Sequence, residues 1–315
     1  MRNFYYKLPL RHKRGLWGVI FMLPWFIGFL LFFARPFVET VLYSFSDVAV
    51  HPIEGIERVF IGFANYTQAF TVDPHFNRYI ITLAFPALAM VVIVVIFSLL
   101  SAMLINGKYF GRGIVRAVFF IPIIMGANIA VAAIAGDDVV TQATTASLGF
   151  GGFSSQFLIE ILNSTGLPTA LTSYVTQAIT GIFGVLAQSG VPILIFLAGL
   201  QSISPAMYEV AKIEGATGYE TFWKVTLPMI SPMILLSTVY TIVDMFVRHA
   251  IVGPAIPGLA AGGTPVPFLQ YIRHIGFISQ DYGLASAMSV VYILACLLVI
   301  VIVTAIMSKG VFYYD

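Results

Sequence analysis

The chain has 315 residues, of which 59% are hydrophobic and only 10% are charged. A soluble globule of this size would need about 25% charged residues, so the composition excludes an ordinary water-soluble domain and indicates a protein solvated by lipid. The formal net charge of +2 gives no sign of nucleic-acid binding. The single cysteine, Cys296, excludes a disulfide within the chain and a metal site built on cysteines.

Six apolar runs are long enough, at about 20 residues each, to cross a hydrocarbon core roughly 30 Å thick. We therefore predict an all-α integral membrane protein with six transmembrane helices. Residues 1–14 are expected to form a basic cytoplasmic arm, and residues 15–315 a single transmembrane domain. The length of the first run and the lack of a small-residue cleavage site after it argue against a signal peptide. The runs lie near residues 16–34, 80–105, 117–136, 174–200, 229–250 and 283–307.

The segments that join these runs leave no room for a second domain. Between the first two runs, residues 35–78 contain turn signals, and residues 60–70 are expected to form a short helix. Residues 252–280 begin with a stretch rich in Gly and Pro, which predicts an irregular loop followed by a short helix near residues 269–277.

Basic residues indicate the orientation of the chain, because Lys and Arg are retained on the cytoplasmic side. With the N-terminus inside, eleven of the sixteen Lys and Arg residues lie inside, and nine of the acidic residues lie outside. Both termini are therefore expected to be cytoplasmic. The basic arm would rest on anionic lipid headgroups.

The polar segment 204–232 interrupts the apolar sequence and has the signals of two short helices. Ser204 is a favourable N-cap and Pro205 a favourable first residue, so a helix should start there and end at Gly215. Thr217 with Glu220 three residues later forms a capping-box pattern, which predicts a second helix directly afterwards. The apolar face of that helix would come from Phe222, Trp223 and Val225, with Pro228 closing it or leading into the next apolar run. The segment is therefore predicted to form an elbow.

Glu209, Ala211, Gly215 and Ala216 stand at the spacing E-A-A-x-x-x-G-A. With these residues, the elbow resembles the cytoplasmic EAA loop of ATP-binding cassette (ABC) importer membrane subunits. Two positions depart mildly from the usual form, Val210 and Glu214. The stretches MLPWFIGFLLFFARPFVETVLYSFSD, FIGFANYTQAF, GRGIVRAVFFIP, LAGLQSISP and DYGLASAMSVV extend the resemblance over most of the chain, toward carbohydrate-type permeases. The residues that match the loop, and that the resemblance implies couple to an ATPase, are Glu209, Ala211, Gly215, Ala216, Phe222, Leu227 and Pro228, followed by Pro232.

The resemblance implies a type I ABC importer permease with a coupling-helix loop in the bacterial cytoplasmic membrane. Such a subunit would translocate a sugar or oligosaccharide inward by ATP-driven alternating access. Its implied partners are a second homologous permease, two ABC ATPase subunits that bind ATP and Mg, an extracytoplasmic solute-binding protein and the carbohydrate itself. The chain has no phosphate-binding loop, since Gly107-Lys108 lacks the upstream glycine and the following hydroxyl residue. No cofactor and no enzyme activity are therefore expected in this chain.

Other functions remain possible from the residues alone. A related permease could carry a non-sugar solute such as glycerol phosphate, a polyamine or a peptide. An ATP-independent secondary transporter would need no elbow and would usually show an inverted repeat or more spans. An intramembrane enzyme would need paired catalytic groups, and only one intramembrane aspartate, Asp244, is present.

Polar residues inside the apolar runs mark the expected translocation path, because each is costly there unless it faces a cavity or a partner. Those of the fifth run recur at helical spacing and share about a third of the helix circumference. The candidates of the fifth run are Ser237, Tyr240, Thr241, Asp244 and Arg248. Weaker candidates are Gln188 and Ser189 in the fourth run and Asn128 in the third.

Each candidate also has a purely structural interpretation. Asp244 and Arg248, four residues apart, could simply neutralise each other against a neighbouring helix. The small residues around Asn128 more often indicate close helix packing. The fifth run matches the helix that carries sugar contacts in the maltose-type permease, so the resemblance favours the path. A phosphorylated polyol could also pair with Arg248, and the residues alone do not decide between it and a neutral sugar.

Overall fold

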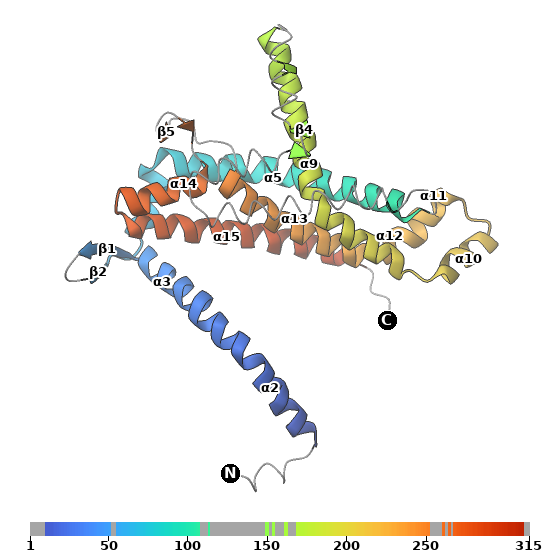
Figure 1. The fold of residues 1–315 in the computed structure, drawn as a ribbon, viewed down its shortest axis with the longest axis horizontal. Coiled ribbons are helices and arrows are strands. Elements are labelled where there is room, and N and C mark those ends of the chain that lie inside the picture. Colours follow the sequence, from blue (N-terminus) through green and yellow to red (C-terminus); the bar gives the residue numbers. More distant parts are fainter. Residues whose placement is uncertain are drawn as a thin grey trace. The chain divides into compact units, whose positions relative to one another are not determined.

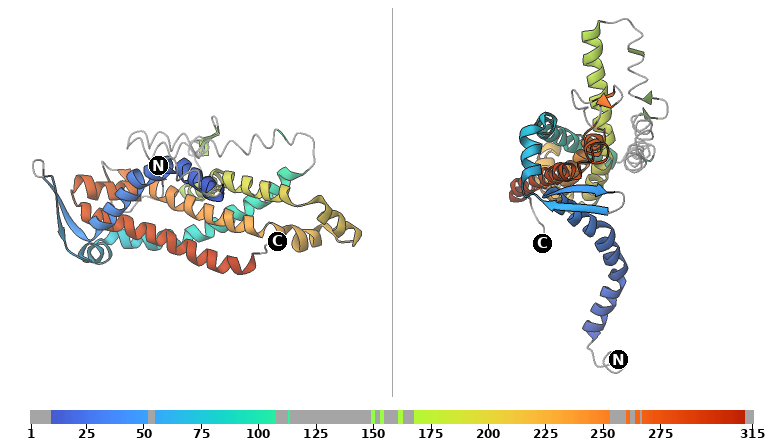
Figure 2. Two further views of the ribbon diagram at one scale, coloured as in Figure 1. Left: turned by 90° about the horizontal axis from the view of Figure 1, so that it is seen from below. Right: turned by 90° about the vertical axis from the view of Figure 1, so that its left-hand side faces the viewer.

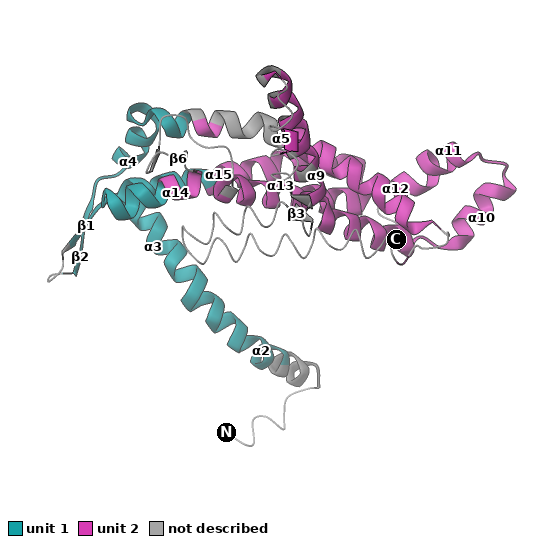
Figure 3. Ribbon diagram, turned by 45° about the horizontal axis from the view of Figure 1, so that its top comes forward, with its two compact units in different colours: residues 1–77, 272–292 teal, residues 78–271, 293–315 magenta. Residues whose placement is uncertain are grey.

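A computed structural model of the chain describes residues 10–51, 55–107, 113, 149–150, 153–154, 161–162, 168–252, 260–261, 264–265 and 267–311. The chain divides into two compact units, which are described separately (Figure 3). Unit 1 comprises Met1–Asn77 and Ile272–Tyr292, and unit 2 comprises Arg78–Tyr271 and Ile293–Asp315. Most of the predicted basic arm lies outside the described residues, and the predicted division into an arm and one domain stays a prediction.

The described part of the chain is mostly helical, with three short pairs of strands (Figures 1 and 2). In the labels, η marks a π-helical turn, except for η5, which is a 3-10 turn. In chain order the elements are α2 (Leu10–Phe29), η1 (Leu30–Ala34), α3 (Arg35–Ser44), β1 (Ser46–His51), β2 (Gly55–Phe60), α4 (Ala64–Thr67), η2 (Gln68–Val72), α5 (Pro74–Asn106), β3 (Gly149–Phe150), β4 (Phe153–Ser154), α9 (Thr169–Ser202), α10 (Pro205–Ile213), α11 (Gly218–Thr221), η3 (Phe222–Thr226), α12 (Leu227–Met229), α13 (Ser231–Val252), β5 (Ala260–Ala261), β6 (Thr264–Pro265), α14 (Phe268–Arg273), η4 (His274–Ile278), α15 (Tyr282–Met307) and η5 (Ser308–Gly310).

Five helical segments among the described residues are long and apolar enough to cross a membrane. They coincide with five of the six predicted runs. The sixth, residues 117–136, lies outside the described residues, and so does Asn128. The five segments are Gly18–Ser44, Leu88–Asn106, Gly184–Ser202, Ser231–Ile251 and Tyr282–Gly310.

The first helix is longer than predicted. We expected the apolar run to end at residue 34, but α2, η1 and α3 continue one helical path as far as Ser44. Pro36 lacks an N–H and its ring would crowd the carbonyl four residues earlier, which normally breaks a helix. Here a π-helical turn comes just before it, and the Arg35 N–H bonds to the Leu30 carbonyl, five residues back. This π-helical turn ends two residues before the proline. Two other π-helical turns likewise end two residues before Pro74 and Pro228.

An antiparallel hairpin, β1 with β2, follows this helix in unit 1 and was not predicted. Its register pairs Ser46 with Phe60 and His51 with Gly55. The alternating β-branched residues around Val48 and Val50 favour extended backbone, but the stretch is too short to give a strong strand signal. The fold is thus mostly helical rather than purely α.

Asn65 joins the start of the hairpin to the next helix in unit 1. Its side-chain amide is buried and donates to the carbonyl oxygens of Ser44 at 3.1 Å and Ser46 at 2.9 Å. Asn65 lies in α4, which continues into η2 up to Val72, close to the short helix predicted for residues 60–70. The carbonyls at the end of the first helix and at the start of β1 therefore share one buried donor.

Unit 2 is built around α9 and α13, which are packed against each other. The two helices approach so closely at Gly199 that a Cβ placed there would lie 2.6 Å from Met233 Cγ. At another level of the unit, the rings of Tyr79 and Phe268 stack at 4.4 Å, and the Tyr79 hydroxyl donates to the His249 carbonyl at 2.9 Å. Phe268 begins α14, which with η4 confirms the helix predicted near residues 269–277.

Candidate functional site

The first half of the elbow is α10, whose bounds confirm the predicted short helix. Ser204 occupies the N-cap position, although its side chain makes no capping hydrogen bond. At the other end, the Gly215 N–H bonds to the Lys212 carbonyl at 3.0 Å and the Ala216 N–H to the Ala211 carbonyl at 2.9 Å. These two bonds form a Schellman motif, which requires a left-handed residue after the C-cap. Gly215 supplies it with a φ of +77°.

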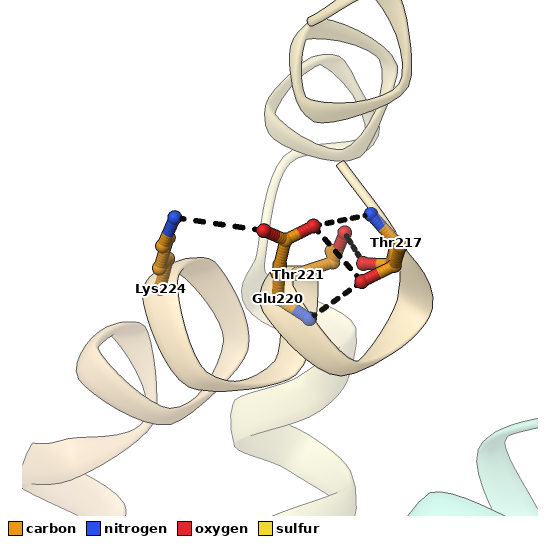
Figure 4. Close-up of polar contacts among 4 residues, drawn as sticks. All are labelled: Thr217, Glu220, Thr221 and Lys224. Atoms are coloured by element: carbon orange, nitrogen blue, oxygen red, sulfur yellow. Dashed lines mark hydrogen bonds and ion pairs between the residues drawn. The ribbon is translucent and has the colours of Figure 1, made fainter. Parts of the chain in front are cut away.

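The second half begins at α11 with the predicted capping box, which the structure confirms (Figure 4). The Glu220 N–H donates to Thr217 Oγ1 at 3.3 Å, and the Thr217 N–H and hydroxyl each donate to Glu220 Oε2 at 2.9 Å. Lys224 Nζ lies 3.9 Å from the other carboxylate oxygen. The two bonds from Thr217, backbone first, and then the charge of Lys224 lower the pKa of Glu220 below its ordinary value.

After α11 the chain turns through η3 and α12 before α13 begins. The Leu227 N–H bonds to the Phe222 carbonyl, five residues back, which accommodates Pro228 in a continuing helical path. The path breaks only at Ile230. We predicted that Pro228 would close the second helix or lead into the next run, and the structure supports the second outcome.

All seven predicted coupling residues lie in this elbow, at one end of unit 2 (Figure 1). Glu209 and Gly215 are exposed, Ala211 is buried, and Ala216, Phe222, Leu227 and Pro228 are half-buried. A further group of exposed apolar side chains lies on the same elbow and was not predicted. The available signal was their presence in an otherwise polar segment. The group consists of Val210, Ile213 and Tyr219, with exposed fractions of 52%, 85% and 74%. Trp223, which was predicted to lie on the apolar face of the second helix, is 50% exposed.

A hollow of about 280 Å³ lies on the inner side of the elbow, beside the end of α5. The Tyr208 hydroxyl and Thr226 Oγ1 lie 3.4 Å apart at its wall. The elbow is thus a turn of fixed shape with an apolar outer surface. The hollow is lined by Met103, Tyr208, Lys212, Ala216, Gly218, Thr221, Phe222 and Thr226.

The polar residues of α13 divide into an enclosed and a partly exposed group. Ser237 and Thr241 are fully buried, and Thr241 Oγ1 donates to the Ser237 carbonyl at 2.7 Å. Tyr240, Asp244 and Arg248, which lie four residues apart in succession, are half-buried. Arg248 Nε donates to Asp244 Oδ2 at 2.6 Å, and these side chains are 16% and 17% exposed. These five residues form the polar stripe of α13. The ion pair lies among its more exposed residues.

On α9, Gln188 and Ser189 stand one turn before Pro192. Because Pro192 has no N–H, the carbonyl of Gln188 lacks its ordinary helical donor. Ser189 Oγ donates to the Leu186 carbonyl at 2.9 Å, and the Ser189 carbonyl accepts from Ser98 Oγ at 3.5 Å. Gln188 Oε1 is buried without a hydrogen-bond partner among the described residues, and so is Ser237 Oγ of α13.

The close contact of Gly199 with Met233 fixes the relative height of α9 and α13. α9 leads into the elbow and α13 leads out of it, so both helices extend from the elbow into unit 2 with opposite chain directions (Figure 1). Gln188 and Asp244 each lie eleven residues from that contact along their helices. Since both helices rise by about 1.5 Å per residue, these two residues lie at equal distances along their helices from that contact.

Comparisons with known proteins were made at the level of families, sequences and structures. No family model matches the chain. The "Probable ABC transporter permease protein YesP" of Bacillus subtilis (strain 168) is 28% identical over 312 residues, covering 96% of this chain and 92% of that protein. The trehalose/maltose transport system permease protein MalF of Thermococcus litoralis is 25% identical, covering 89% and 90% respectively. The multiple sugar-binding transport system permease protein MsmF of Streptococcus mutans is 28% identical, covering 87% and 89%.

A chain from the crystal structure of a bacterial alginate ABC transporter, in complex with a periplasmic protein that holds an alginate pentasaccharide, shares the fold. Its TM-score is 0.59 at 19% identity, covering 92% of this chain and 93% of that one. Five apolar helical segments and relatives that are membrane permeases make this chain a multi-pass membrane protein. The resemblance inferred from the sequence is confirmed: over most of its length, the chain is homologous to permease proteins of sugar ABC transporters.

Proposed function

We propose that this chain is the membrane-spanning permease subunit of a binding-protein-dependent ABC importer, and that it carries a sugar or oligosaccharide into the cell. Several of its relatives are named as permeases of trehalose/maltose and multiple-sugar transport systems. ATP-driven alternating access, as in other ABC importers, would move the solute past α9 and α13.

The observation that carries this proposal is the elbow. Its two turns are fixed by a Schellman motif and a capping box, so its shape does not depend on a partner. Its outer surface nevertheless exposes large apolar side chains such as Ile213 and Tyr219. A rigid polar loop with an apolar ridge suits a surface that another protein grips, because burying such a ridge in an interface is favourable.

The proposed assembly contains partners that the elbow and the relatives suggest. Two ABC ATPase subunits would bind the elbows of this chain and of a second homologous permease, and would hold ATP and Mg. An extracytoplasmic binding protein would deliver the carbohydrate. The proposed topology has six spans, with the run 117–136 as the third, and both termini in the cytoplasm of a bacterial cell. This topology places the elbow on the same side as the ATPases.

Co-purification tests this proposal. An affinity-tagged chain, extracted from the membrane of its own host in mild detergent, should bring with it an ABC ATPase and a second permease. After reconstitution, sugar-loaded binding protein should stimulate ATP hydrolysis by that complex. Recovery of the chain alone, transporting solute without ATP, would contradict the proposal and favour a secondary transporter. A matched tag on an unrelated membrane protein of the same host controls for non-specific recovery.

A further inference from the structure

The ion pair of α13 carries the charges of the described spans that lie in unit 2. Three of the candidate spans lie wholly in this unit: Leu88–Asn106, Gly184–Ser202 and Ser231–Ile251. Within these three described spans, Asp244 and Arg248 are the only Asp, Glu, Lys or Arg residues. Asp244 and Arg248 therefore contribute all the Asp, Glu, Lys and Arg charge that these three described spans bring to the local electrostatic potential.

The geometry of the pair leaves both side chains able to meet a solute. Each is about one-sixth exposed, at 16% for Arg248 and 17% for Asp244, so neither is sealed in the packing. Their contact uses Nε of the guanidinium and one carboxylate oxygen, at 2.6 Å. A guanidinium has five N–H donors and a carboxylate has two acceptor oxygens, so one such bond occupies a small part of their capacity.

We propose that Asp244 is a charge-selectivity residue, which cancels Arg248 and makes the path fit for neutral carbohydrate rather than for anionic sugars such as uronates or sugar phosphates. The inference rests on the proposed function. Sugar hydroxyls both donate and accept, so a neutral sugar can accept hydrogen bonds from Arg248 and donate hydrogen bonds to Asp244. The carboxylate or phosphate group of an anionic sugar can only accept, and the nearby Asp244 carboxylate would repel it while competing for Arg248.

Removing the Asp244 carboxylate would change the charge of this part of α13. Without that carboxylate, Arg248 would stand as a cation with no opposite charge in the three described spans of unit 2. Such a site would attract anionic solutes, as Arg does wherever carboxylate or phosphate is recognised. The similarity in fold to a transporter of alginate, which is an acidic polysaccharide, does not determine the charge of the solute that this chain carries.

The test measures the local potential directly and needs no knowledge of the sugar. In a Cys296→Ala background, Tyr240→Cys places a thiol on the half-buried part of the stripe, one turn from Asp244. The assembled complex in membrane vesicles is treated with a cationic and with an anionic methanethiosulfonate reagent of similar size. The ratio of the anionic to the cationic rate reports the potential at that position.

We expect Asp244→Asn to raise this ratio by about tenfold or more, and Arg248→Gln to lower it by a similar factor, because each removes one of two charges within several ångströms of the thiol. The double variant should return the ratio close to its starting value. A matched reporter, Ile213→Cys on the exposed elbow, should show no change with any of these substitutions.

The outcomes separate the two proposals. If the thiol introduced by Tyr240→Cys reacts, but its ratio stays constant in either single variant that assembles, the charge inference is overturned and the importer function stays intact. If that thiol is unreactive toward both reagents in a complex that still transports, the inference is also overturned, because the stripe is then removed from the path. Failure of the unmutated complex to contain an ATPase would instead contradict the proposed function.

Discussion

The α10–α11 elbow and the polar stripe of α13 arrange polar and apolar groups in opposite ways. In the elbow, the bonds that form the two turns join residues at most five positions apart, and large side chains such as Ile213 and Tyr219 face outward. In the stripe, apolar side chains enclose polar ones, and Ser237 Oγ has no hydrogen-bond partner among the described residues. The two turns of the elbow have local hydrogen bonds and expose apolar side chains, whereas the stripe buries the Ser237 hydroxyl without a partner among the described residues.

This difference suggests what each region is built to meet. An exposed apolar surface on a rigid turn gains stability when a protein covers it. A buried hydroxyl or amide oxygen is stabilised when a hydroxyl-rich solute or a water molecule forms a hydrogen bond with it. In the proposed importer, the elbow transmits force and the stripe contacts solute. Substitutions in the elbow should therefore impair the coupling of transport to ATP. Substitutions in the stripe should impair assembly or the passage of solute.

Gly215→Pro should have the largest effect. Proline has no N–H to donate to Lys212 and cannot adopt the φ of +77° found at this position, so the Schellman turn would be lost. ATP-driven uptake should fall by more than tenfold, while the chain still inserts in the membrane, as measured by transport and by membrane fractionation. The control is Gly218→Ala, at a helical position where an added Cβ meets nothing within 4 Å. Wild-type uptake by Gly215→Pro would remove the elbow from the coupling mechanism.

Asp244→Ala should mainly reduce assembly. Leaving one charge of a buried pair without its partner typically costs about 3 to 5 kcal/mol, and the partial exposure of this pair reduces that cost. The yield of assembled complex should drop, and Asp244→Asn combined with Arg248→Gln should recover much of it. If the pair also meets solute, the recovered complex should keep its ATPase activity and transport poorly. Normal transport by the double variant would mean that solute binding does not need the charged groups of the pair.

Gly199→Ala tests whether the stripe depends on close packing between α9 and α13. The added methyl would lie 2.6 Å from Met233 Cγ, and such overpacking costs about 1 to 3 kcal/mol. The thermal midpoint of the purified complex should fall, and Met233→Ala should restore part of the loss. Gly181→Ala, in the same helix with open space around it, is the matched control. Equal midpoints for the two alanine variants would contradict the observed contact.

The two regions also differ in how far they could be predicted from sequence. The signals of the elbow are local: Pro205 begins a helix, Gly215 ends it, and Thr217 with Glu220 begins the next, so its helices were predicted close to their observed bounds. The π turn before Pro228 was missed, because no local pattern distinguishes a broken helix from one that adjusts to proline. The same ambiguity caused the first span to be ended at residue 34, ten residues early.

For the stripe, helical spacing predicted one shared arc but not its burial. Which of its side chains are enclosed depends on the neighbours that cover each level of α13, and this is a property of helix packing rather than of periodicity. Ser237 and Thr241 are therefore sealed, while Tyr240, Asp244 and Arg248 stay half-buried. The roles of these residues and of the coupling residues stay predictions.

The smallest expected effect is a pH dependence of the capping box. Glu220 has a pKa lowered by the two Thr217 bonds and Lys224, so its carboxylate stabilises the folded elbow more than the unfolded chain. The sign follows from that direction. This contribution is fully present above the unfolded-state pKa of about 4.5 and is lost as the pH falls through the lower folded-state pKa.

Amide hydrogen exchange of residues 217–221, corrected for the intrinsic pH dependence, should therefore show constant protection down to about pH 5 and reduced protection below it. Glu220→Gln keeps an acceptor oxygen but has no titrating group, so its protection should be lower at neutral pH and flat across this window. Glu214→Gln removes a carboxylate outside the capping box and should leave the wild-type profile unchanged. A flat wild-type profile would mean that the exposed carboxylate contributes too little to hold the second turn, and that the helical path through η3 fixes the elbow instead.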